Sequence, residues 1–225
     1  KIDEICFSPT GGTKRVSAII TRTLANEVTG IDLTKREMYF SSLELPDDVA
    51  VIAVPSYGGR VPQPAAERLA AIHANGARAI LLCVYGNRAY EDTLTELQDI
   101  AQKAGFRVVA AVAAIAEHSI VRKYAAGRPD VDDSRRLKEF ALRIREKIDK
   151  GDDTAPQIPG NRPYKLSGKV GIVPKATRKC VKCGLCAVKC PVGAIDMKDP
   201  SKVDKNLCIS CLLYTSPSPR DYAAS

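Results

Sequence analysis

The stretch Val49-Ala-Val-Ile-Ala-Val54 is an unbroken apolar run of strand length, and Pro55 ends it. A second continuous apolar run covers residues 79–85, and a third, rich in alanine and β-branched residues, covers 106–116. Strands that are apolar on both faces are typical of parallel sheets, because helices cover such sheets on both sides. These runs therefore predict the buried strands of a parallel sheet.

Amphipathic stretches separate the apolar runs. Each stretch carries apolar residues at the i, i+3, i+4 spacing of one helix face, as Val16, Ile19 and Ile20 illustrate. The expected helices lie near residues 16–24, 65–72, 94–104 and 137–148. Two further strands are expected at 1–7 and 31–33. This alternation of five strands with helices predicts a doubly wound α/β domain over residues 1–150.

The composition changes after this domain. Residues 151–168 show no periodicity, which predicts an extended, semi-rigid linker. Its turn-forming residues are Pro156, Pro159, Gly160 and Pro163. Residues 169–211 contain too few apolar side chains to build a core unaided. We therefore expect a metal or a cluster to organise this second module.

Six of the eight cysteines lie between residues 180 and 211. The run Cys180-Val-Lys-Cys183-Gly-Leu-Cys186-Ala-Val-Lys-Cys190-Pro191 has the Cys-x2-Cys-x2-Cys-x3-Cys-Pro spacing that binds a cubane [4Fe-4S] cluster. In two-cluster proteins with this run, the fourth cysteine binds the other cluster. Cys190 therefore requires a second cysteine run to complete its site.

A second run begins at Cys208-Ile-Ser-Cys211 and is incomplete. Its next ligands are due at positions 214 and 218, where the chain has Tyr214 and Ser218. Each expected ligand set is therefore one thiolate short of four. The expected sets are Cys180, Cys183 and Cys186 for one cluster, and Cys190, Cys208 and Cys211 for the other.

Residues 212–225 suggest a reason for the shortfall. The sequence Leu-Leu-Tyr-Thr-Ser-Pro-Ser-Pro-Arg-Asp after Cys211 resembles the translation of a transposase adapter used in sequencing libraries. We expect this tail to be non-native, with the natural sequence lost from about residue 210. The alternative is a natural site with three cysteines, or one completed by Ser218.

Three loops follow predicted strands and therefore lie at the carboxyl edge of the sheet, where open α/β sheets bind ligands. The loop at residues 8–13 combines hydroxyls with two glycines at a helix start, which favours an anion site. The loops at 55–62 and 85–90 place an aromatic ring beside glycine. Ordinary turns, with Thr13 as a helix N-cap, are the alternative interpretation. The candidate binding residues are Ser8, Thr10, Gly11, Gly12, Thr13, Ser56, Tyr57, Gly58, Gly59, Tyr85, Gly86, Asn87 and Tyr90.

The first loop resembles the phosphate loop of flavodoxins, whose hydroxyl-x-Thr-Gly-x-Thr sequence is matched by Ser8, Thr10, Gly11 and Thr13. Together with the cysteine runs, residues 1–211 resemble flavodoxin–ferredoxin fusion proteins. The resemblance implies FMN, the strand order 2-1-3-4-5, and Tyr57 or Tyr90 stacked on the flavin. It also implies two [4Fe-4S] clusters in the natural full-length protein.

The formal net charge of +8 does not indicate nucleic acid. Between residues 165 and 211, ten Lys or Arg stand against three Asp. This excess offsets bound anions, namely the clusters and a flavin phosphate. The chain has no apolar run of membrane-spanning length and no secretory signal, and thiolate–metal chemistry fits a reducing cytoplasm. We therefore expect redox partner proteins, no nucleic acid, no membrane insertion and a cytoplasmic location.

The expected function is electron transfer between FMN and iron–sulfur clusters. One alternative is a flavin-dependent oxidoreductase that reduces a small acceptor such as a quinone. Another is a zinc-binding module built on the Cys183–Cys186 and Cys208–Cys211 pairs, which leaves Cys180 and Cys190 unused. Outside these motifs, Cys6 and Cys83 are expected to be buried small hydrophobes and His73 to be solvated. His118 follows the fifth strand and is expected near the same sheet edge.

Overall fold

A computed structural model describes residues 1–45, 48–166, 168, 171–176 and 180–212. The first part of the chain forms a sheet of five parallel strands in the order β2-β1-β3-β4-β5. The doubly wound α/β fold and its implied strand order are confirmed. The strands are β1 (Ile2–Cys6), β2 (Val28–Asp32), β3 (Val49–Pro55), β4 (Arg78–Tyr85) and β5 (Arg107–Ile115).

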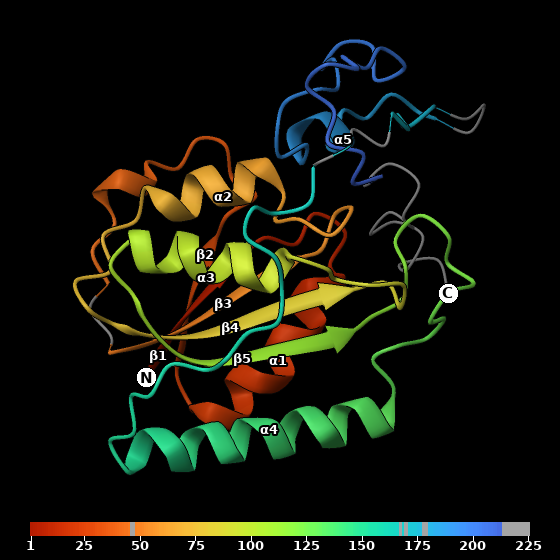
Figure 1. The fold of residues 1–225 in the computed structure, drawn as a ribbon. Coiled ribbons are helices and arrows are strands. Elements are labelled where there is room, and N and C mark those ends of the chain that lie inside the picture. The colour runs from red at the N-terminus through yellow and green to blue at the C-terminus, as the bar shows by residue number, and fades with distance from the viewer. Residues whose placement is uncertain (46–47, 167, 169–170, 177–179, 213–225) are drawn as a thin grey trace.

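Helices cover both faces of this sheet (Figure 1). Helices α2 and α3 pack with the sheet in one apolar core, and α1 and α4 pack with its other face in a second core. The helices are α1 (Gly12–Leu24), α2 (Gln63–Ala70), α3 (Thr93–Lys103) and α4 (Val131–Asp149), with a short 3-10 turn at Phe40–Ser42.

Strand β3 shows why a continuous apolar run is required in the middle of the sheet. Successive side chains of a strand point to opposite faces. Val51 lies in the core under α1 and α4, whereas Ile52 lies in the core under α2 and α3, and both are 0 % exposed. The expected burial of Cys6 and Cys83 is confirmed in the same way, and burial raises the pKa of Cys6 to about 12.

Element boundaries differ in places from the sequence-based expectation. Helices α1 and α4 begin at Gly12 and Val131, several residues before the expected starts at 16 and 137. Strand β2 begins at Val28 rather than Ile31, because backbone pairing with β1 extends it through two exposed residues that carry no apolar signal. Helix α2 ends at Ala70, although Ile72 beyond it is buried. The apolar pattern therefore extends past the end of the helix, because Ile72 is buried without being helical.

Helix α4 begins with a capping box. The Asp130 carboxylate accepts a hydrogen bond from the Asp133 backbone N–H at 2.9 Å, and the Asp133 carboxylate accepts one from the Asp130 N–H at 3.1 Å. We expect Asp130→Ala to lower the free energy of unfolding by about 1 kcal/mol, because the Asp133 backbone N–H loses its acceptor. Urea unfolding measures this change. Asp132→Ala is the control, since Asp132 is exposed and pairs only on the surface with Arg135; an equal loss in both variants would contradict the prediction.

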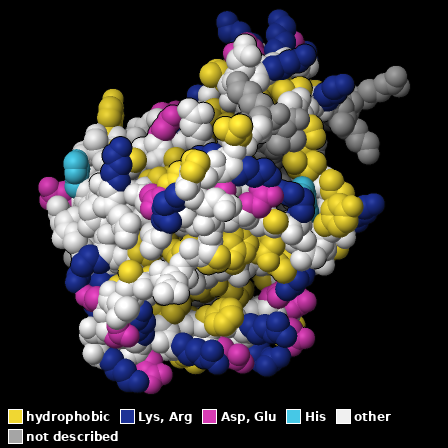
Figure 2. Space-filling view, viewed as in Figure 1, with side chains coloured by type: hydrophobic (Ala, Val, Ile, Leu, Met, Phe, Trp, Pro, Cys, Tyr) yellow, Lys and Arg dark blue, Asp and Glu magenta, His cyan; other side chains and the backbone are white. Residues whose placement is uncertain are grey.

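The second module, described over residues 171–176 and 180–212, has a small core of its own. It contains the short helix α5 (Leu185–Val188) and an antiparallel bridge between Ile195 and Val203. The core cluster of this module consists of the buried residues Ala187, Cys190, Ala194 and Ile195. Cys211 and Leu212 are also buried. Lys and Arg side chains gather at the outer end of this module (Figure 2). Of the tail expected to be non-native, only Leu212 lies within the described residues.

Residues 151–166 contain neither helix nor strand. In the described part of the chain, no helix has both the length and the apolar character needed to cross a membrane.

Candidate functional site

The three predicted loops meet at one cavity of about 360 Å³ at the carboxyl edge of the sheet. A volume of this size is within the range of small-molecule sites. The loop after β5 closes one side of the cavity, and the second module contributes Ile172, Ile209 and Ser210. Eight predicted residues line the cavity: Thr10, Gly12, Thr13, Ser56, Tyr57, Gly58, Tyr85 and Gly86.

Five predicted residues lie beside the cavity without lining it: Ser8, Gly11, Gly59, Asn87 and Tyr90. The ring of Tyr90 packs edge-on against Tyr85, with 5.3 Å between the ring centroids. Of the two tyrosines expected to stack on a flavin, only Tyr57 therefore lines the cavity. Sequence reasoning assigned Pro9, Glu117, Ser119, Ile120, Val121, Ile172, Ile209 and Ser210 no role in binding, yet they line the cavity.

The first loop presents the start of α1 to the cavity. Gly11 adopts a φ of 84°, which lets the chain turn into the helix. The Ser8 hydroxyl accepts a hydrogen bond from the Lys14 backbone N–H at 3.0 Å and fixes the loop against the first helical turn. Gly12 and the buried Thr13 line the cavity. Because the first N–H groups of a helix have no intrahelical acceptor, this end of the cavity suits an anion.

The second loop makes a tight two-residue turn. Tyr57 and Arg60 exchange backbone hydrogen bonds of 3.0 and 3.2 Å. Gly58 and Gly59 between them have φ values of 62° and 85°, which a turn of this type requires at both positions. Burial raises the pKa of Tyr57 well above its usual range, and the neighbouring Cys211 adds to the shift. Tyr57 thus lines the cavity and lies near Cys211 of the second cysteine run.

The third loop passes so close to His118 that residue 86 must lack a side chain. A Cβ at Gly86 would lie 2.4 Å from the His118 Cδ2 atom. His118 itself is fixed, because its Nδ1 accepts hydrogen bonds from the Ile120 and Val121 backbone N–H groups, both at 3.1 Å. Since Nδ1 accepts, the neutral ring carries its proton on Nε2.

The first cysteine set lies on the outer part of the second module. Cys183 is exposed, whereas Cys180 and Cys186 are half-buried. Burial raises the pKa of Cys186, and its proximity to Cys180 and Cys183 acts in the same direction. Gly184, with a φ of 72°, turns the chain into α5 between the second and third cysteines. These three cysteines therefore lie close enough to influence one another.

The second cysteine set surrounds a small apolar cavity of about 20 Å³. Cys190, Cys208 and Cys211 line it together with Ile209, which also lines the larger cavity. The Cys190 Sγ accepts a hydrogen bond from the Ala194 backbone N–H at 3.3 Å. Ile209 therefore borders both the cavity of this cysteine set and the ligand cavity.

None of the eight cysteines, all within the described residues, forms a disulfide bond. In the described ranges, no three His, Cys, Asp or Glu side chains converge on a single metal position. A cubane cluster does not require such convergence, because each of its thiolates binds a different iron.

Two arginines join the second module to the sheet domain. The Arg68 guanidinium on α2 donates hydrogen bonds of 2.6 Å to the Leu33 and Pro191 carbonyls. A Cβ at Gly193 would lie 2.5 Å from the Arg36 Nη1 atom, which shows how closely that side chain approaches the turn after Cys190. The cysteine module is therefore held against α2 and the loop after β2.

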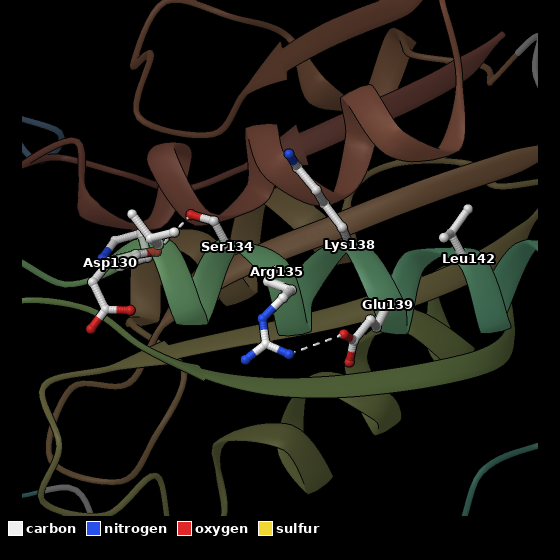
Figure 3. Close-up of a pocket in the computed structure, with 8 residues that line it drawn as sticks. Asp130, Ser134, Arg135, Lys138, Glu139 and Leu142 are labelled. Carbon is white, nitrogen blue, oxygen red and sulfur yellow. Dashed lines mark hydrogen bonds and ion pairs between the residues drawn. The ribbon is translucent and has the colours of Figure 1, made fainter.

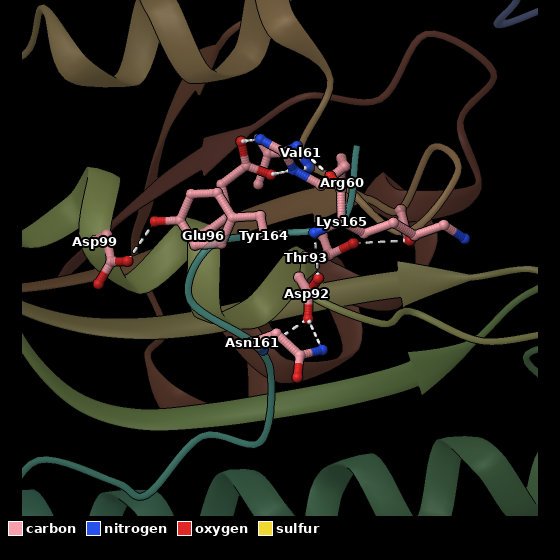
Figure 4. A network of polar contacts seen from close by, with 10 residues as sticks. Arg60, Val61, Asp92, Thr93, Glu96, Asp99, Asn161, Tyr164 and Lys165 are labelled. Carbon is pink, nitrogen blue, oxygen red and sulfur yellow. Dashed lines mark hydrogen bonds and ion pairs between the residues drawn. The ribbon is translucent and has the colours of Figure 1, made fainter. Parts of the chain in front are cut away.

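The linker residues 159–165, here called the strap, lie against α3 (Figure 4). Arg162 donates two hydrogen bonds to the Asp99 carboxylate, at 2.9 and 2.7 Å, and the Tyr164 hydroxyl donates to the same carboxylate. The buried Asp92 carboxylate accepts from the Asn161 and Lys165 backbone N–H groups, at 2.8 and 2.7 Å. The linker is thus docked along much of its second half.

The strap is expected to detach in acid. Hydrogen bonds from Lys165 and Asn161 lower the pKa of Asp92, and those from Arg162 and Tyr164 lower the pKa of Asp99. A carboxylate with a lowered folded pKa stabilises the fold above its unfolded pKa of about 4, and this contribution is lost as the pH falls through the folded value. The backbone amide NMR signals of Asn161 and Lys165 should therefore shift with midpoints below 3.8.

Asp92→Asn provides the control for this titration, because an amide does not titrate. In this variant, the backbone amide signals of Asn161 and Lys165 should not shift in this pH range. A midpoint above 3.8 in the unmodified chain would contradict the prediction.

A larger hollow lies along the outer surface of α4, away from the three loops (Figure 3). It has a volume of about 590 Å³ and is open to solvent. Arg135 and Glu139 form an ion pair of 3.6 Å across it. None of the predicted binding residues lines this hollow, and Leu142 at one end is exposed.

Residues 174–196 match the 4Fe-4S binding domain family. Among solved structures, oxidised Flavodoxin 2 from Bacillus cereus is similar at 18% identity, over 65% of this chain and 99% of that chain, with a TM-score of 0.50. The apo form of the NADH:FMN oxidoreductase EMOB is similar at 15% identity, over 65% and 88% of the two chains, with a TM-score of 0.50. No curated protein sequence matches the chain.

The chain therefore combines a flavodoxin-like α/β fold with a 4Fe-4S binding domain. The family match includes Cys180, Cys183, Cys186 and Cys190, so it favours an iron–sulfur cluster over the zinc alternative. The structural likenesses concern the fold of the sheet domain.

Proposed function

We propose that this chain transfers electrons between FMN, bound in the 360 Å³ cavity, and [4Fe-4S] clusters bound by the two cysteine sets. The observation that carries the proposal is the position of Ile209. This residue lines both the ligand cavity and the cavity of Cys190, Cys208 and Cys211. The two redox groups would then lie on opposite sides of one side chain.

The residues of the cavity suit FMN. The start of α1, with Thr10, Gly12 and Thr13, would hold the phosphate through backbone N–H groups and hydroxyls. Tyr57 offers an aromatic face, and Gly58 and Gly86 leave room for the flavin ring and offer backbone polar groups to its edge. FMN exchanges one or two electrons, which lets it connect one-electron clusters to two-electron partners. The protein positions the group and excludes water from it.

The residues of the cysteine module suit thiolate-bound clusters. Cys180, Cys183 and Cys186 would bind the outer cluster, and Cys190, Cys208 and Cys211 the cluster next to the flavin. Backbone N–H donors such as that of Ala194 stabilise thiolate charge and tune the potential. We propose two clusters in the natural protein, with redox partner proteins reaching the exposed side of Cys183.

Anaerobic purification of the full chain, with quantification of FMN, iron and sulfide, tests this proposal. The absorbance spectrum should contain flavin bands above broad cluster absorption. After rapid reduction of the clusters by a one-electron donor, the flavin bands should bleach without added mediator. Cluster absorption without flavin, even after incubation with FMN, would refute the flavin half of the proposal.

A flavin-dependent reductase of small acceptors is the second candidate, and His118 favours it. Its Nε2–H belongs to a residue that lines the cavity, so a hydrogen-bond donor is available beside a reducible acceptor. Steady-state turnover with a quinone distinguishes the two functions. A reductase would lose turnover in His118→Ala while FMN stays bound, whereas a pure carrier would show no turnover in either chain.

A further inference from the structure

We propose that docking of the strap strengthens FMN binding, because the strap supports the Tyr57–Arg60 turn through Arg60 and Asp92. The inference rests on the proposed function. It assigns Arg60 and Asp92 as positioning residues, which act on the ligand through the turn and not by contact. The strap would then couple the position of the linker to the affinity for FMN.

Arg60 is the first of the two links. Its backbone closes the turn that carries Gly58 and Gly59, whereas its side chain leaves the cavity. The guanidinium donates two hydrogen bonds of 2.8 Å to the Glu96 carboxylate on α3 and one of 2.6 Å to the Lys165 carbonyl of the strap. It also lies 4.9 Å from the centre of the Tyr164 ring. One side chain therefore fixes the turn to both α3 and the strap.

Asp92 is the second link. Its backbone N–H donates to the Gly59 carbonyl at 3.1 Å, so it fixes the orientation of a peptide group within the turn. Its carboxylate accepts three hydrogen bonds from the strap, two from Asn161 and one from Lys165. Asp92 is 1 % exposed, and its carboxylate accepts these bonds away from bulk water. Loss of the strap would leave this buried carboxylate short of donors.

Glu91 adds a third connection at the same place. Its Oε2 atom lies 2.6 Å from the Lys165 Nζ of the strap, and a Cβ at Gly59 would lie 2.0 Å from this oxygen. The carboxylate therefore lies directly over the turn. When Lys165 leaves, Glu91 loses the partner that holds it there, and Arg88 alone remains as its ion pair.

The strap can be displaced without changing any residue of the turn. A Cβ at Gly160 would lie 2.0 Å from the Thr95 Oγ1 atom and 2.8 Å from the Thr95 Cβ atom on α3. Gly160→Val should therefore force the strap away from α3. Gly168→Ala is the matched control, because a Cβ at Gly168 has no described atom within 4 Å.

The test makes two measurements on the full chain. Fluorescence quenching gives the affinity for FMN, and the rate of trypsin cleavage after Lys165 reports detachment of the strap. We expect Gly160→Val to speed the cleavage and to weaken FMN binding about fivefold to tenfold, with Gly168→Ala unchanged. Arg162→Ala, which removes two of the strap's hydrogen bonds to Asp99, should act in the same direction if Gly160→Val fails to fold.

Reciprocity gives a readout that a merely structural strap would not show. If the strap strengthens FMN binding, then FMN must strengthen strap docking by the same factor. Hydrogen exchange of the Asn161 and Lys165 amides should therefore slow when FMN is added to the unmodified chain. If FMN slowed exchange at residues 56–60 but not at 161–165, the inference would be overturned. The same holds if Gly160→Val sped trypsin cleavage of the strap and left the affinity for FMN unchanged. A wild-type chain that binds no FMN would overturn both this inference and the proposed function.

Discussion

Replacing Cys186 with alanine should remove the iron and sulfide of the outer cluster and unfold the cysteine module. Thiolates are the protein ligands of such a cluster, so loss of one among three leaves too few bonds to hold it. The module cannot compensate by packing, since its core consists of Ala187, Cys190, Ala194 and Ile195. As in other small metal-dependent domains, the binding energy of the cluster is folding energy. Iron and sulfide analysis and tryptic mapping of residues 171–212 measure the loss.

The sheet domain should survive this substitution, because its two apolar cores contain no residue of the cysteine set. Cys83→Ala is the matched control, since it removes a cysteine from the sheet core without touching the module. It should cost about 1 kcal/mol of sheet stability and leave the iron content unchanged. An iron content in Cys186→Ala equal to that of the unmodified chain would rule out Cys186 as a ligand.

Gly86→Ala is expected to weaken FMN binding at least about tenfold, which corresponds to about 1.4 kcal/mol. The added Cβ would lie 2.4, 2.7 and 2.8 Å from the Cδ2, Cγ and Cβ atoms of His118. His118 cannot turn aside cheaply, because two backbone N–H groups hold its Nδ1. Either the loop after β4 or the loop after β5 must move, and overpacking of this kind costs about 1–3 kcal/mol. Fluorescence titration with FMN measures the result.

Gly30→Ala is the control for this prediction. A Cβ at Gly30 has no described atom within 4 Å, and its position in the edge strand β2 tolerates alanine. Its FMN affinity should equal that of the unmodified chain. If steric pressure on the imidazole is the cause, adding His118→Ala to Gly86→Ala should recover part of the lost affinity. Failure of this rescue, with the domain folded, would show that Gly86 acts in another way.

The sequence predicted the sheet well because burial on both faces leaves a direct signal. Strands β3, β4 and β5 are long apolar runs, and their ends place the three loops at one edge. The strand that was misplaced, β2, lies at the edge of the sheet and exposes Thr29 and Gly30, so its pairing and not its composition defines it. Loop residues such as Thr10, Ser56 and Gly86 followed from their positions after the strands.

The remaining features of the site arise from contacts between distant parts of the chain. Arg162 and Asp99, or Lys165 and Glu91, are ordinary surface residue types with no periodic pattern, and more than 60 positions separate the members of each pair. Nothing local in a proline-containing linker indicates that it will dock. Ile209 likewise stands between two cysteines that the motif predicts as ligands, and its place in the ligand cavity follows only from the packing of the module.

The position of Ile209 has a consequence for electron tunnelling. Tunnelling rates fall steeply with the distance between redox groups, and in the proposed arrangement the shared position of Ile209 would keep this distance short. Its aliphatic side chain would also reduce the water between the two groups, so less solvent would have to reorganise when charge crosses. The outer cysteines have no such cover, since Cys183 is exposed. The two cysteine sets would therefore differ in their role: the outer one would exchange electrons with diffusing partners, and the inner one would pass them to the flavin past Ile209.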